Sequence, residues 1–141
     1  MSLIQLRTSA AASHRDLRRF LPTTREEMEA RGWTELDILL VNGDAYVDHP
    51  AFGAALIGRF LEARGFRVGI ISQPSYQDTS DLLRMGVPRL MVGVTAGNLD
   101  SMLNKLTAQK KIRSEDQYSP GGAVGLRPNR ASIVYGNLCR K

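Results

Sequence analysis

The sequence predicts an α/β domain with a doubly wound, mostly parallel sheet of four to five strands. Apolar runs of strand length recur along the chain, segments with helical spacing lie between them, and glycine or proline marks most boundaries. Strands that are almost continuously apolar are typical of a parallel sheet covered on both faces. With 141 residues the chain has the length of a single domain, which can bury roughly two thirds of the surface that its unfolded form exposes.

The expected elements alternate along the chain. Four apolar runs predict strands over 36–42, 67–72, 90–95 and 132–138. Helices are expected between the first three strands and after the third, over 50–64, 78–85 and 98–106. In the first of these, Phe52, Leu56 and Phe60, with Ala55 and Ile57 beside them, form the apolar stripe of a helix that covers a core.

Two further segments lie outside this alternation. Residues 1–31 are expected to form a helical extension, with one helix over 9–20 and another that Thr23 or Thr24 caps and Gly32 ends. Residues 32–141 are then the α/β domain. The irregular stretch 107–130 is longer than most loops, and such loops are usually functional or packed on a partner.

Polar residues follow three of the predicted strands. Right-handed crossovers place the carboxyl ends of parallel strands at one edge of a sheet, where open α/β sheets bind ligands. The sequence therefore predicts a crevice for a cofactor or substrate at this edge. Its candidate residues are Asn42, Asp44, Tyr46, Asp48, His49, Gln73, Thr95 and Asn98.

Several candidates allow two interpretations. Asp48 and His49 would suit a metal or a general base, but adjacent residues rarely face each other, and Asp48 before Pro50 also fits a helix cap. Asp44 is expected to point into the crevice or to form an Asx turn with its own backbone. The turn at 95–98 could hold an anion on its backbone N–H groups. The chain lacks a complete glycine-rich nucleotide motif.

Composition narrows the classes of partner. The net charge of +5 permits nucleic acid, but the densest basic group runs directly into Glu115 and Asp116 and has no aromatic platform, so a solvated loop or a domain contact is favoured. Nucleic acid and membrane are not expected as partners. Cys139 is the one cysteine, so it forms no internal disulfide, which fits a cytoplasmic location. A single thiolate cannot hold an iron–sulfur cluster.

Six phrases are more specific than any of these motifs. They are FLPTTREEM (20–28), VNGDAYVDHPAFGAALIGR (41–59), RVGIISQP (67–74), VGVTAGNLDSM (92–102), TAQKKIRSEDQYSPGG (107–122) and GLRPNRASIVYGNL (125–138). In this order they resemble the N-terminal region of the YgiQ-type radical SAM proteins, a largely uncharacterised family. The resemblance covers nearly everything from Phe20 to the end.

The resemblance implies that a catalytic radical SAM domain follows this one as its partner. That domain would carry a C-x-x-x-C-x-x-C motif, whose three thiolates bind a [4Fe–4S] cluster to which S-adenosylmethionine attaches. Residues 1–141 lack the motif, so no cofactor and no catalysis are expected within this chain. The domain also resembles the cobalamin-binding, flavodoxin-like fold. The cobalt-ligating D-x-H-x-x-G motif is not matched, because Asp48 and His49 are adjacent and Gly53 lies four residues further on.

The sequence is compatible with three alternative functions. The first is an accessory domain of a radical SAM enzyme, whose crevice faces the catalytic domain or an unknown small-molecule substrate and whose loop 119–127 packs on that domain. The second is a self-sufficient module that binds a small molecule or nucleotide. The third is a basic adaptor that binds RNA.

Overall fold

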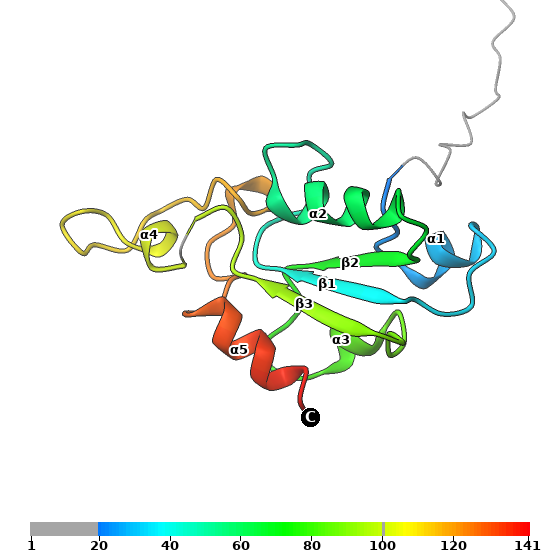
Figure 1. Ribbon diagram of the computed structural model, residues 1–141. Coiled ribbons are helices and arrows are strands. Elements are labelled where there is room, and N and C mark those ends of the chain that lie inside the picture. Colours follow the sequence, from blue (N-terminus) through cyan, green and yellow to red (C-terminus); the bar gives the residue numbers. More distant parts are fainter. Residues whose placement is uncertain (1–19, 100) are drawn as a thin grey trace, which may run out of the picture.

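The computed structural model describes residues 20–99 and 101–141, and its centre is a sheet of three parallel strands in the order β2-β1-β3. The α/β fold class and the parallel sheet are confirmed, with three strands in the described residues where the sequence predicted four to five. The strands, shown in Figure 1, are β1 (Ile38–Asn42), β2 (Val68–Ser72) and β3 (Met91–Thr95).

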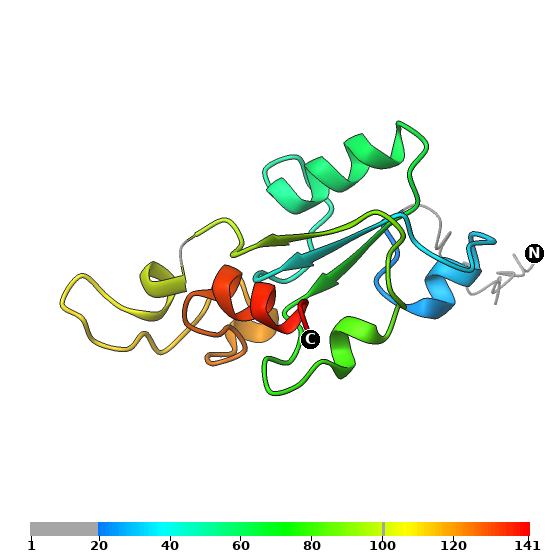
Figure 2. The ribbon, with the colours of Figure 1, turned by 60° about the horizontal axis from the view of Figure 1, so that its bottom comes forward.

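Helices cover both faces of this sheet, as in a doubly wound fold (Figures 1 and 2). Helix α2 (Gly53–Glu62) lies over one face, and α3 (Ser80–Leu83) and α5 (Ala131–Leu138) lie over the other. The other helices of the described part are α1 (Arg25–Glu29), α4 (Ser101–Lys105) and the 3-10 turn η1 (Pro120–Gly122).

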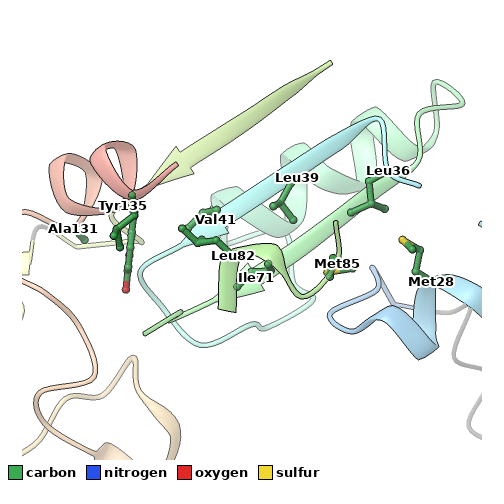
Figure 3. Close-up of a cluster of buried hydrophobic side chains, with 10 residues drawn as sticks. Met28, Leu36, Leu39, Val41, Ile71, Leu82, Met85, Ala131 and Tyr135 are labelled. Atoms are coloured by element: carbon green, nitrogen blue, oxygen red, sulfur yellow. The ribbon is translucent and has the colours of Figure 1, made fainter. Parts of the chain in front are cut away.

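The alternation of strand side chains divides the core into two clusters. Ile38 and Leu40 of β1 point toward α2 and pack with Leu21, Val68 and Ile70. The intervening residues of β1 point to the opposite face. The cluster on that face, drawn in Figure 3, consists of Met28, Leu36, Leu39, Val41, Ile71, Leu82, Met85, Ala131, Tyr135 and Leu138.

Helix α1 begins as predicted, at a threonine cap. The Thr24 hydroxyl accepts a hydrogen bond from the Glu27 amide at 3.3 Å, and the Glu27 carboxylate accepts one from the Thr23 amide at 2.7 Å. Gly32, with a φ of 75°, follows the helix and stops it. The other predicted helix of this region, over 9–20, lies outside the described residues except for Phe20.

The predicted strand over 132–138 is wrong, because this segment forms helix α5. The β-branched pair Ile133 and Val134 favoured a strand. Ala131, Tyr135 and Leu138 instead recur at helical spacing, and all three are buried in the core cluster of Figure 3. The helix forms because it buries this apolar face of α5 against β3.

Helix α2 presents a different face to the sheet from the one expected. Ala55 and Gly58 are its buried residues, whereas Leu56, Ile57 and Phe60 are 53%, 54% and 56% exposed. A Cβ atom at position 58 would collide with the side chain of Leu21, so glycine permits the close approach of helix and sheet. The predicted apolar stripe is therefore mostly turned away from the core.

Candidate functional site

The carboxyl ends of β1 and β3 meet at the point where the strand order reverses. The Gly43 amide donates a hydrogen bond to the Thr95 carbonyl at 3.1 Å, and a Cβ atom on Gly43 would collide with the carbonyl oxygen of Ala96. In open α/β sheets this reversal is the usual position of a ligand. Here the two loops approach each other too closely to leave a gap between their backbones.

Asp44 is the most buried of the predicted site residues, at 1% exposure. Its carboxylate accepts a hydrogen bond of 2.6 Å from the Asn98 amide. Gly97 has a φ of 107° and passes so near Asp44 that a Cβ atom there would overlap the carboxylate. The turn after β3 therefore closes around Asp44, and the carboxylate occupies the anion position that the sequence suggested for this turn.

Five of the eight predicted residues come together at the edge of the sheet formed by the carboxyl ends of the strands, called the rim below. Gln73 joins β2 to it, since its amide donates to the Asn42 carbonyl at 2.7 Å and its side-chain Nε2 donates to Ser119 Oγ at 2.6 Å. The Asn42 side chain donates to the Asp44 carbonyl, and the Thr95 hydroxyl accepts from the Gly97 amide. The converging residues are Asn42, Asp44, Gln73, Thr95 and Asn98.

Tyr46, Asp48 and His49 turn away from the rim and lie beside α2. Asp48 pairs with Arg59 of α2 through contacts of 2.5 and 3.1 Å. The α2 N-cap is Phe52, so the helix-cap interpretation of Asp48 is wrong. His49 Nδ1 accepts from a backbone amide two residues later, which makes it part of a turn.

The Tyr46 hydroxyl accepts a hydrogen bond from the Leu21 amide at 3.1 Å. Burial raises the pKa of Tyr46 to about 12, so the hydroxyl stays protonated at neutral pH. This hydrogen bond links the loop after β1 to the segment that precedes α1. This role is structural and lies away from the rim.

Sequence reasoning missed the central residue of the rim, Arg127. Its guanidinium reaches between β1 and β3, with Nη1 2.6 Å from Asp44 Oδ1 and 3.2 Å from the Ala96 carbonyl oxygen. Nη2 lies 3.4 Å from Asp116 Oδ2, and the Arg127 side chain is 4% exposed. Arg127 therefore fills the position where a ligand was expected.

The loop that carries Arg127 is anchored on this chain at its two ends, Ser119 and Arg127, which are buried. The packing of residues 119–127 on a following domain stays a prediction. Asp116 and Ser119 are buried, and the Ser119 hydroxyl donates to Asp116 at 2.9 Å. The Tyr118 carbonyl accepts from the Ala45 amide at 2.8 Å. No motif marked Arg127. The available signal was the length of an irregular loop that had to cover a polar edge.

A cavity of about 500 Å³ lies on the outer side of Arg127, within the range of small-molecule pockets. None of the eight predicted residues lines it. Tyr76 lies at one wall, where its hydroxyl donates to the Gly125 carbonyl, and Lys105 lies at another, where it donates to Asn129. The remaining wall is Asn104, Ile112, Asp116, Val124, Gly125, Pro128 and Val134.

Neither a metal centre nor a membrane span is found in the described part of the chain. No group of three or more histidine, cysteine, aspartate or glutamate side chains there could hold a metal ion. No helix among the described residues has the length and apolar character needed to cross a bilayer.

Fold and rim together define a small doubly wound domain whose usual ligand position is closed by its own arginine. The chain belongs to the Radical SAM N-terminal family, whose pattern matches residues 20–141. This finding confirms the resemblance drawn from the sequence. No solved structure matches the chain.

Curated relatives are similar over 122 residues, which are 86% of this chain. A UPF0313 protein of Pseudomonas putida is 60% identical and one of Thermotoga petrophila is 61% identical. A third, from Vibrio vulnificus, is 57% identical. The match spans 16% of the Pseudomonas and Vibrio proteins and 22% of the Thermotoga protein, so most of each relative lies outside it.

Proposed function

We propose that this chain is an accessory domain of a longer radical SAM protein and that the outward face of α2 docks on the rest of that protein. Two findings support the proposal: the family is described as Radical SAM N-terminal, and most of each curated relative lies outside the match. The observation that carries it is the apolar surface of α2.

That surface consists of Leu56, Ile57 and Phe60, each more than half exposed. Arg64 lies over the Phe60 ring, with Cζ 4.5 Å from the ring centroid, and leaves the rest of the patch apolar. A helix on the surface of an isolated domain normally turns polar residues outward, and a contiguous apolar patch with a polar rim usually marks an interaction site. Docking would bury these side chains.

The residues of this chain do not fit the iron–sulfur cluster that the family implies. Three thiolates bind such a cluster in radical SAM domains, and Cys139 is the one cysteine in the sequence. The cluster and S-adenosylmethionine are therefore assigned to the rest of the longer protein. Arg127 and its carboxylate partners brace the domain at its rim.

A chimaera tests the proposal. Residues 20–141 would replace the matching segment of the Thermotoga petrophila relative, and Leu56→Asp and Phe60→Asp would be introduced together. The melting temperature and the reductive cleavage of S-adenosylmethionine to 5′-deoxyadenosine would be measured. We expect cleavage to fall at least about tenfold, because a charge would be placed in a dry interface.

Two controls separate docking from folding. In the isolated chain the double variant should unfold within about 1 kcal/mol of the wild type, because both side chains are already exposed. Leu103→Asp, at a residue of α4 that is 63% exposed, replaces an exposed apolar side chain elsewhere by one carboxylate and should leave the chimaera unchanged. If the chimaera with the α2 substitutions cleaved S-adenosylmethionine as fast as the unsubstituted chimaera, the proposal would be contradicted.

The cavity beside Arg127 favours a second candidate, a binding site for a small organic molecule within this domain. Its walls combine apolar side chains with the polar groups of Tyr76, Lys105 and Asp116. Calorimetric titration of the isolated chain with nucleotides, flavin and cobalamin tests it. Saturable binding that Val134→Trp abolishes would support this candidate, and no heat with any of the three would count against it.

A further inference from the structure

The outer edge of β3, meaning the side turned away from β1, offers unpaired backbone groups. Met91 donates to the Asp37 carbonyl and Thr95 accepts from the Gly43 amide, so these two residues of β3 bond toward β1. Backbone groups alternate along a strand, which places those of Gly93 toward β1 and those of Val92 and Val94 at the outer edge. Nothing in the described residues hydrogen bonds to them.

The sequence of β3 is that of an interior strand. MVGVT contains no charged residue and no proline, which are the usual protections of a natural edge strand. Every residue of β1 is buried, whereas every residue of β3 is at least partly exposed. Met91 is 53% exposed, and α2 packs against β1 and β2 on that face of the sheet. An apolar edge without these protections is suited to pairing with another strand.

The handedness of the crossovers determines where a further parallel strand would lie. The chain passes from β1 to β2 through α2 on one face, and from β2 across β1 to β3 through α3 on the other face. Both passages are right-handed when the helices lie on opposite faces. Helix α5 lies on the same face as α3, so a right-handed crossover through α5 leads to the outer edge of β3 (Figures 1 and 2).

The direction of α5 agrees with this path. It starts near the carboxyl ends of the strands, four residues after Arg127, and runs toward their amino ends. Leu138 and Cys139 line one groove together with Leu39, Val92 and Pro88. A chain that leaves α5 here is at the height at which a strand parallel to β3 must begin.

We propose that the outer edge of β3 pairs with a parallel β-strand supplied by the part of a longer radical SAM protein that follows this domain. The strand order then becomes β2-β1-β3 plus the added strand beside β3. This inference rests on the proposed function, because it requires the longer protein. It specifies a contact through backbone hydrogen bonds, distinct from the contact through α2.

Hydrogen exchange at single-residue resolution tests the inference. The isolated chain would be compared with the Thermotoga petrophila chimaera that carries residues 20–141. The Val92 and Val94 amides should exchange at least about 100-fold more slowly in the chimaera. The Gly93 amide points toward β1 in both proteins and serves as the internal control. Equal exchange of Val92 and Val94 in the two proteins would overturn the inference.

A substitution gives an independent measurement. Val92→Pro removes an outward N–H, and Val92→Ala removes similar packing but keeps the N–H. The two variants should melt within about 3 °C of each other in the isolated chain. In the chimaera the proline variant should melt at least about 5 °C below the alanine variant. Equal melting of the two variants in the chimaera would overturn the inference.

The outcomes distinguish this inference from the proposed function. If the α2 variants weaken the chimaera while Val92 and Val94 remain unprotected, the strand pairing is wrong and the accessory role stands. If neither effect is seen, both are wrong. Protection of Val92 and Val94 in the isolated chain that rises with concentration, together with a dimer mass, would identify a second copy as the occupant and overturn the pairing proposed here.

Discussion

The two outer strands of the sheet have equal length and similar composition, but they differ in what covers them. Four of the five residues of β2, VGIIS, are buried, and none of β3, MVGVT, is. The edge of β2 is sealed by the segment before α1, where the Ile70 amide donates to the Pro22 carbonyl at 2.9 Å and Leu21 packs beneath α2. Burial of a strand thus depends on its neighbours more than on its own residues.

The largest expected effect concerns the rim, where Arg127 holds the loops after β1 and β3 together. Arg127→Leu should destabilise the isolated chain by about 3–5 kcal/mol, because it leaves Asp44 buried without its cation. Urea unfolding at neutral pH measures this. Arg84→Leu, at an exposed arginine after α3, is the control and should cost less than about 1 kcal/mol. Similar losses of stability for the two variants would show that Arg127 does not hold the loops after β1 and β3 together.

A second prediction compares the sealed and open edges directly. Leu21→Ala removes a side chain that is 1% exposed and should cost about 2–5 kcal/mol. Met91→Ala removes a side chain that is 53% exposed and should cost less than about 1 kcal/mol. Both are measured by denaturant unfolding of the isolated chain. Equal losses would mean that β3 is covered as well as β2.

The smallest expected effect is at Asp37, whose carboxylate contacts the start of both outer strands. Arg67, before β2, donates to it through its side chain and its backbone amide at 2.8–3.1 Å, whereas Arg89, before β3, is 3.6 Å away. These hydrogen bonds from Arg67 lower the pKa of Asp37 to about 2. The stability that Asp37 contributes is present above the unfolded pKa of about 3.9 and is lost as pH falls toward 2.

Arg67→Gln should therefore raise the pKa of Asp37 toward its ordinary value, and Arg89→Gln should change it little. Nuclear magnetic resonance titration of the Asp37 carboxyl carbon measures both. Stability of the Arg67 variant should also depend less on pH between about 4 and 2. A larger pKa change in the Arg89 variant would show that the β3 side holds Asp37 more tightly than the distances indicate.

The sequence predicted those features that follow from strand direction. Asn42, Gln73 and Asn98 meet at one rim because parallel strands end at the same edge, whatever the ligand. The apolar run of β1 correctly predicted that this strand is buried. Burial was predicted for both β2 and β3, because both strands are apolar. Only β2 is buried, and the difference comes from distant segments that cover it.

Other features depend on contacts that local patterns do not contain. Helix α5 looked like a strand because the β-branched pair at its centre outweighed the helical spacing of Tyr135 and Leu138. Arg127 lies in a loop without a motif, and its partner Asp44 is 83 positions earlier in the numbering of the chain. The exposed stripe of α2 was visible in the sequence, but its direction depended on the small residues Ala55 and Gly58.

One edge of this sheet, that of β2, is sealed within the domain, and the other edge, that of β3, is open. Hydrogen exchange in the isolated chain tests this difference most directly, by comparing the Ile70 amide with those of Val92 and Val94. We expect the Ile70 amide, which is hydrogen bonded to the Pro22 carbonyl, to exchange at least about 100-fold more slowly than either valine amide. Equal protection of the three amides at low protein concentration would contradict it.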